Sequence, residues 1–329
     1  MSFSHVRMIL RIMIQNRRST LINFLGLVLG LSSFVVLFSW IRTEFSVDRF
    51  HKNKGQLYQL VIQFPDGPLD SNTPYALAPE MMNTFPEISS YTRLVRMQTN
   101  QNSTFDFFPD DPDNEPVYEN MVACVDTAFF QMFSFSPVHG IGQFQMQRPD
   151  GVVLNRKLAE KYFGNENPVG KQILMNARVL LEVTGVVEIP ENTQFNYDLF
   201  LPLPESYHSS WTWRDPSFVM LHPGVDKQVF EDRLLTYFNE TLPSELPGNH
   251  QLKLLAIEKA NLAFGKRKEF LLFSFIAIMI LVIVAINYMN LSTANYTKRI
   301  REMGMRKIIG ATPRFLRNQL FAETLIQTT

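Results

Sequence analysis

The sequence has very little cysteine: Cys124 is its single one in 329 residues. One cysteine excludes an internal disulfide and a cysteine-rich zinc module. The 15 glycines and 19 prolines follow no period, which excludes collagen-like and low-complexity chains. The patterns Gly-x-Ser-x-Gly and His-Glu-x-x-His are also missing, and the six histidines are scattered. We therefore expect no catalytic residues, no metal site and no cofactor.

One segment, 164–172 (GNENPVGKQ), has some likeness to a phosphate-binding loop. It has five residues between its glycines instead of four, and a glutamine stands where a serine or threonine would hold magnesium. We interpret its glycines as turn residues. We interpret Cys124, inside a predicted strand, as a small buried hydrophobe, and the aromatic cluster Trp211, Trp213 and Phe218 as core packing.

Two blocks, 21–41 and 270–289, lack any charged side chain. About twenty helical residues cover the roughly 30 Å hydrocarbon core of a bilayer, whereas a buried core helix usually has about 10–14 apolar residues. The first block is long, and no small-x-small cleavage site follows it, so we interpret it as an uncleaved anchor. The sequence therefore predicts two transmembrane helices, over 21–41 and 270–289.

The net charge of zero hides a separation of charge along the chain. The two ends outside these blocks hold 11 basic and 2 acidic residues, whereas residues 42–269 hold 20 basic and 29 acidic residues. By the positive-inside rule, both ends are cytoplasmic and residues 42–269 are extracytoplasmic. The basic cluster 266–268 opposes this orientation, but long translocated domains tolerate such clusters.

The N-terminal segment 1–20 has apolar residues on one helical face and arginines on the other. This pattern is typical of an amphipathic helix at the membrane interface, where arginines meet anionic lipid headgroups. A plain cytoplasmic extension of the first span fits the pattern equally well. Within the first span, we predict that Gly26, Gly30 and Ser33 form a small-residue face for helix packing. Such pairs also arise by chance in membrane helices.

Residues 42–269 alternate strand-like and helix-like segments, which predicts an α+β domain with a mixed sheet in two lobes. Asn155 is predicted to cap a helix that ends at Gly164, and the acidic segment 106–119 to form a hairpin loop. The other expected strands are 57–64, 117–125, 180–187 and 251–256, and the other expected helices are 75–85 and 226–239.

The C-terminal segment 290–329 has a short apolar patch between Gly304 and Gly310, followed by Thr312 as a helix cap and Pro313. This pattern predicts a short cytoplasmic helix, a break, and a second helix directed back toward the membrane. The many basic residues here are explained by membrane topology and headgroup contact, so we expect no nucleic-acid partner.

In this segment the chain resembles the FtsX-like, MacB-type permeases of bacterial ABC transporters. The similarity lies in the pattern Arg301-Glu302-x-Gly304-x-Arg306-Lys307-x-x-Gly310-Ala311, followed by Gln319 and Glu323. Met305, where the family often has isoleucine or valine, departs from the pattern. The similarity continues through the outer domain in the motifs Asp48-Arg49-Phe50, Asp126-x-x-Phe129-Phe130-x-Met132-Phe133, Phe163-Gly164, Pro168-x-Gly170-Lys171, Val183-Thr184-Gly185-Val186-Val187 and Pro190-x-Asn192.

The resemblance implies a non-catalytic permease subunit of the bacterial inner membrane. It implies that a separate cytoplasmic ABC ATPase drives the outer domain by mechanotransmission, for export of substrate or activation of a hydrolase. Expected partners are this ATPase, a second permease copy or half, membrane lipid, and a periplasmic adaptor or hydrolase. Family members continue with further spans, so we expect this chain to stop before a third one. The residues implied to dock on the ATPase are Arg301, Glu302, Gly304, Met305, Arg306, Lys307, Ile308, Ile309, Gly310 and Ala311.

Two other classes of protein share parts of this organisation. A two-span sensor would have an extracytoplasmic ligand-binding domain and the same topology. It would need an output module or signalling coiled coil after the second span, and residues 290–329 have no sustained heptads. A membrane-anchored enzyme would need a catalytic constellation.

Overall fold

The structure is a computed structural model that describes residues 17–64, 67–97, 104–111, 113, 115–119, 121–140, 146, 148–207, 209–212, 214–241 and 251–308. The chain divides into two compact units. One unit contains the residues before 42 and after 270, and the other contains residues 42–270. The N-terminal segment 1–16, predicted to be an amphipathic helix, lies outside the described residues.

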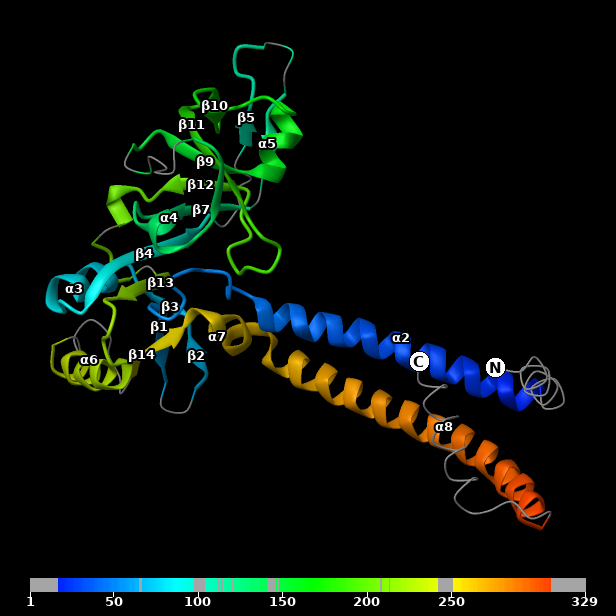
Figure 1. The fold of residues 1–329 in the computed structure, drawn as a ribbon. Coiled ribbons are helices and arrows are strands. Elements are labelled where there is room, and N and C mark those ends of the chain that lie inside the picture. Colours follow the sequence, from blue (N-terminus) through cyan, green and yellow to red (C-terminus); the bar gives the residue numbers. More distant parts are fainter. Residues whose placement is uncertain are drawn as a thin grey trace. The chain divides into compact units, whose positions relative to one another are not determined.

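Two long helices form the described part of the first unit: α2 (Arg17–Ser46) and α8 (Arg267–Ile308) (Figure 1). Leu25–Ser46 and Arg267–Met289 are long and apolar enough to cross a membrane. Their apolar side chains are largely exposed, as expected of surfaces that face lipid. Helix α8 is unbroken through Gly304, so the short cytoplasmic helix predicted there is the end of a 42-residue helix. The predicted break and return helix lie outside the described residues.

The second unit is built on one continuous path of paired strands in the order β14-β1-β13-β4-β7-β12-β9-β11-β10-β5-β6. The pairs β12–β7 and β11–β9 are parallel and the other pairs on the path are antiparallel, so the sheet is mixed as predicted. The strands are β1 (Leu57–Gln63), β2 (Leu69–Asp70), β3 (Asn72–Pro74), β4 (Ile88–Arg96), β5 (Thr104–Asp106), β6 (Val117–Tyr118), β7 (Val122–Val125), β8 (Ser136–His139), β9 (Gly151–Asn155), β10 (Gln172–Met175), β11 (Val179–Glu188), β12 (Leu199–Pro202), β13 (Arg214–Leu221) and β14 (Gln251–Ala256).

Different helices pack at the two ends of this path and define two lobes. The first lobe contains β1, β2, β3, β13 and β14 with helices α3 (Leu77–Thr84) and α6 (Lys227–Thr241). The second lobe contains β5 to β12 with helices α4 (Phe129–Met132) and α5 (Arg156–Phe163). Strand β4 pairs with β13 on one side and β7 on the other, so it joins the lobes. Shorter elements are η1 (Glu205–Tyr207), α7 (Ile257–Asn261) and the π-helical η2 (Leu262–Lys266).

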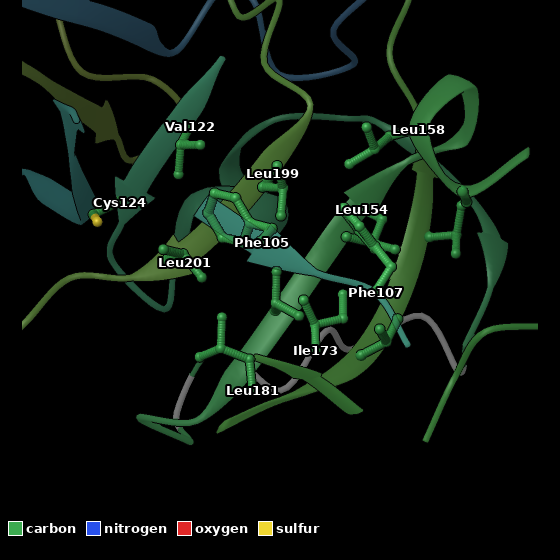
Figure 2. Packing of buried hydrophobic residues seen from close by; sticks show 14 of the residues in the cluster. Phe105, Phe107, Val122, Cys124, Leu154, Leu158, Ile173, Leu181, Leu199 and Leu201 are labelled. Atoms are coloured by element: carbon green, nitrogen blue, oxygen red, sulfur yellow. The ribbon is translucent and has the colours of Figure 1, made fainter. Parts of the chain in front are cut away.

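Each lobe has its own apolar core. In the second lobe, side chains from several strands converge around Phe105 and Leu154, both fully buried (Figure 2). In the first lobe, α3 and α6 bury Met81 and Phe230 against the sheet. A third cluster, rich in phenylalanine, lies next to β4 and contains Phe129, Phe133, Phe195, Phe200 and Phe218. Burial of a large apolar side chain contributes about 1.5–3 kcal/mol, so these clusters stabilise the domain.

Several local predictions are confirmed. The Asn155 side chain accepts a hydrogen bond from the Lys157 backbone N–H at 3.1 Å, and α5 ends at Gly164 with φ of +60°. The last strand, β14, has the predicted bounds. The acidic segment 106–119 connects the antiparallel strands β5 and β6, as a hairpin loop does.

Two predicted elements differ from the structure. The strand predicted over 117–125 is two short strands, β6 and β7, and Glu119 between them has a buried carboxylate. That carboxylate accepts hydrogen bonds from Lys161 Nζ at 2.9 Å and Tyr162 Oη at 2.7 Å. The helix predicted from residue 75 begins at Leu77.

The predicted aromatic cluster is not one cluster. Phe218 is buried in the phenylalanine-rich core, whereas Trp211 packs against the core of the first lobe. Trp213 lies outside the described residues. Cys124 is buried, as predicted, and burial raises the pKa of its thiol to about 12.

Candidate functional site at the neck of the domain

The neck is the segment 44–51, where α2 ends and the chain enters the domain. After Ser46 the chain makes a tight turn in which Asp48 has φ of +55°. Aspartate tolerates this left-handed conformation better than most residues that have a Cβ atom. The turn is fixed by the Asp48 backbone N–H, which donates to the Asn192 carbonyl at 3.0 Å.

The carboxylate of Asp48 is fully buried and its partners come from a distant loop. Thr193 Oγ1 donates to Asp48 Oδ1 at 2.5 Å, and the Gln194 backbone N–H donates to Oδ2 at 3.4 Å. His51 Nε2 lies 3.6 Å from Oδ1. A buried carboxylate is costly unless it is hydrogen-bonded, so these contacts hold segments that are 145 residues apart in the sequence.

The same loop caps the end of α2. Asn192 Nδ2 donates to the Ser46 carbonyl at 3.1 Å and to Ser46 Oγ at 3.2 Å. The last carbonyls of a helix have no intrahelical partner, and an external donor satisfies one of them here. We call Ser46, Asp48, Asn192 and Thr193 the neck latch, because together they tie the end of α2 to the domain.

His51 anchors the neck to the phenylalanine-rich core. Its Nδ1 accepts a hydrogen bond from the Ser134 backbone N–H at 3.1 Å. Its ring lies 5.1 Å from that of Phe133 and 5.4 Å from that of Phe135. This histidine therefore has a structural role, as expected for a scattered histidine.

Residues just before α8 and in its first turn contact the neck directly. Asn261 Nδ2 donates to the buried Glu44 carboxylate at 2.8 Å. The rings of Phe45 and Phe270 meet edge to face, with 4.9 Å between centroids. The segment by which the chain enters the domain and the segment by which it leaves are thus in contact inside the second unit.

A second set of polar contacts locks β4 at the junction of the lobes. Arg93 is fully buried, and its Nε and Nη2 donate to the two carboxylate oxygens of Asp126 at 2.9 and 2.5 Å. Its Nη1 donates to the Tyr75 carbonyl at 3.1 Å. A bidentate pair of this kind fixes geometry as well as charge, so the two lobes are held firmly where β4 joins them.

In the first unit, the structure places Gly26 and Gly30 against α8. A Cβ atom added to Gly30 would lie 2.4 Å from Val284 Cγ2, and one added to Gly26 would lie 3.3 Å from Asn287 Nδ2. Ser33 is exposed, so the structure does not bring it to this contact. A role in helix packing stays a prediction for all three residues.

The residues expected to dock on an ATPase lie at the end of α8. The last turns of α8 contain Arg301, Glu302, Gly304, Met305, Arg306, Lys307 and Ile308. Ile309, Gly310 and Ala311 lie outside the described residues. Their docking role stays a prediction.

The sequence contained both halves of the neck latch, in Asp48-Arg49-Phe50 and Pro190-x-Asn192, but nothing in it indicated that they meet. The latch is mechanical rather than catalytic in its chemistry. Within the described ranges, no group of three histidine, cysteine, aspartate or glutamate side chains is placed to hold a metal ion.

Two family models match the chain. The MacB-like periplasmic core domain matches residues 20–237, about two thirds of the chain. The FtsX-like permease C-terminal domain matches residues 274–329.

Individual relatives are similar over much of the chain. The macrolide export ATP-binding/permease protein MacB of Bdellovibrio bacteriovorus is 26% identical over 223 residues, covering 64% of this chain and 34% of that protein. MacB of Neisseria meningitidis is 28% identical over 182 residues, covering 53% of this chain and 27% of that protein. The chain thus spans about a third or less of the length of these curated relatives. A solved domain of a permease protein from Porphyromonas gingivalis has a TM-score of 0.50 at 18% identity, covering 63% of this chain and 92% of that one, which shows a shared fold.

Proposed function

This chain belongs to the FtsX/MacB-type family of ABC transporter permeases, and we propose that it is a membrane subunit that transmits movement between an ATPase and an extracytoplasmic domain. In this proposal ATP is hydrolysed by a separate cytoplasmic partner. The chain itself is non-catalytic and acts in the bacterial inner membrane, with both ends cytoplasmic and residues 42–269 in the periplasm.

The observation that carries the proposal is the continuity of α8. One unbroken helix of 42 residues contains both the second candidate span and most of the docking residues. At 1.5 Å per residue it is about 63 Å long, roughly twice the hydrocarbon thickness of a bilayer. A helix of this length transmits a displacement from its docking end to the domain better than two helices joined by a flexible break.

The neck, at the domain end of the long helices, also supports a role in transmitting movement. A lever moves a domain only if the joint between them resists bending. The buried neck latch and the Glu44–Asn261 contact supply the part of this joint that lies within the second unit, because breaking the latch would leave the buried Asp48 carboxylate without its Thr193 partner.

The transported substrate and the other partners extend the proposal. The relatives named above are macrolide exporters, and we propose export of a small molecule or peptide from the periplasmic side. We further propose that two permease copies act together, and that a periplasmic adaptor or hydrolase responds to the moving domains.

Co-purification with the ATPase tests the coupling role. The chain is tagged, co-expressed with the ABC ATPase proposed as its partner, and recovered from membranes in detergent. We expect Gly310→Pro and the pair Arg306→Glu with Lys307→Glu to abolish recovery of the ATPase. Lys298→Glu, a charge reversal earlier on α8, is the matched control and should leave recovery intact. Unchanged recovery with the docking variants would refute the coupling role.

A further inference from the structure

A polar pocket of about 310 Å³ opens where the first lobe meets the end of β4. Its wall includes Tyr75, Val95, Arg96, Tyr207, Arg214 and Asp215. None of the neck-latch residues lines it. Its volume is at the lower end of the range for small-molecule sites, and sites between substructures are preferred positions for ligands.

Strand pairing fixes the charged residues of this pocket. Arg214 and Asp215 begin β13, where they pair with Pro74 and Thr73 of β3. Arg96 is the last residue of β4, the strand that joins the lobes. All three charges lie on paired strands instead of loops, so strand register fixes the backbone positions that carry them.

The single acid of the pocket is already engaged. Tyr75 Oη donates to Asp215 Oδ2 at 2.5 Å, and Arg96 Nε lies 3.9 Å from Oδ1, beyond hydrogen-bond distance. Burial raises the pKa of the Asp215 carboxyl, and the hydrogen bond from Tyr75 opposes that rise. The charged side chains of the pocket that remain to bind a ligand are therefore its arginines.

These arginines differ from others in the domain. Arg148 bonds the carboxylates of Asp150 and Glu182, and Arg156 bonds two carboxylates in the same way. Arg214 forms no ion pair within the described part of the chain, and Arg96 has only its loose contact with Asp215. Each guanidinium offers five N–H donors in a planar fork that fits carboxylate or phosphate.

We propose that this pocket binds a small molecule through a carboxylate or phosphate group held by Arg96 and Arg214. The pocket has a net positive charge, from two arginines against one aspartate, and this favours an anion. The ring of Tyr207 and the side chain of Val95 offer a surface for an apolar part of the ligand. The proposal goes beyond the transmission of movement and is independent of any ATPase partner.

Calorimetric titration of the full chain in detergent, at constant ionic strength, tests the proposal. The two probes are inorganic phosphate and 3-phenylpropionate, which separate recognition of the bare oxyanion from recognition that needs an apolar part. We expect saturable binding of at least one probe. Arg96→Gln and Arg214→Gln should each weaken that binding tenfold or more. Arg178→Gln removes an exposed arginine on the turn between β10 and β11 and is the matched control, expected to change nothing.

Asp215→Asn should change the affinity for the probe in the opposite direction. It removes the only negative charge among the described residues of the wall, so we expect tighter binding of the anionic probe. The proposal is overturned if the unaltered chain binds neither probe at millimolar concentration, if Arg178→Gln weakens binding as much as the pocket variants, or if Asp215→Asn weakens it. Arg96 and Arg214 have exposed side chains, so unchanged thermal unfolding midpoints would show that their variants remain folded.

Discussion

Asp48 is the centre of the neck latch, and three substitutions there separate its two contributions. Asp48→Ala removes the carboxylate and puts alanine in the left-handed conformation. Asp48→Gly removes the carboxylate but accepts the conformation. Asp48→Asn keeps an acceptor oxygen for Thr193 and still tolerates φ of +55°.

The expected magnitudes follow from these contacts. Loss of a hydrogen bond to a charged group costs about 1.5–3 kcal/mol, and the left-handed conformation costs a residue with a Cβ atom about 1–2 kcal/mol. Asp48→Ala should therefore cost about 3–4 kcal/mol, Asp48→Gly about 2 kcal/mol, and Asp48→Asn less than about 1 kcal/mol. For a domain of this size, 1 kcal/mol shifts the unfolding midpoint by about 2–4 °C.

Thermal unfolding of the full chain in detergent measures the series. We expect a fall of about 10 °C for Asp48→Ala, a smaller fall for Asp48→Gly and the smallest for Asp48→Asn. Asp110→Ala is the control, because Asp110 is exposed and its side chain forms no hydrogen bond or ion pair within the described residues. The reasoning is refuted if Asp48→Ala and Asp48→Asn give the same midpoint, or if Asp48→Ala shifts it no more than Asp110→Ala does.

Three further predictions concern other parts of the chain. Gly30→Val should separate α2 from α8, because the added side chain would clash with Val284. Adding Val284→Gly should restore the contact between the helices, and Ser33→Val should leave it unchanged. Cross-linking between cysteines introduced at Gly26 and Asn287, in a chain without Cys124, measures this contact. Arg93→Met should lower stability by about 3–5 kcal/mol, because it removes the cationic partner of the largely buried Asp126 carboxylate. Arg93→Met with Asp126→Leu should be more stable than Arg93→Met alone in the same unfolding assay. At pH 8, alkylation of Cys124 should be slower in the folded chain than in urea by three or more orders of magnitude, because its pKa of about 12 lies more than three units above that of a free thiol. The alkylation rate of the folded chain should rise with pH. Equal rates in the folded chain and in urea would contradict the burial of Cys124.

Local features of the fold were predictable because their causes are local. The asparagine cap of α5, its glycine stop and the last strand depend on residues within a few positions of each other. The two long apolar helices were predictable because a charge-free run of about twenty residues suits a membrane-spanning helix better than the shorter helices of a soluble core.

Other elements were missed because polar residues are buried in them. Strand β4 has Thr92 and Arg93 fully buried, so its hydropathy pattern does not alternate as expected for a strand. Strand β13 has a proline near its start and a fully buried Ser217, which weakened its signal in the same way. The buried polar side chains of these strands are stabilised by distant partners such as Asp126, which the local sequence does not identify.

The candidate functional sites differ in the same way: one depends on neighbouring residues and the others on residues that are distant in the sequence. The docking residues form a contiguous motif, so the sequence was enough to propose them. The neck latch and the anion pocket need residues that are more than a hundred positions apart, and only the folded chain brings these together.

The most direct test of the account is the side of the membrane on which the domain lies. In a chain with Cys124→Ala, single cysteines are introduced at Arg178 in the domain and at Lys298 on α8, and spheroplasts are treated with a membrane-impermeant maleimide. The account predicts that the cysteine at 178 is labelled in intact spheroplasts and that the cysteine at 298 is labelled only after lysis. The reverse pattern would place the domain in the cytoplasm and contradict the account.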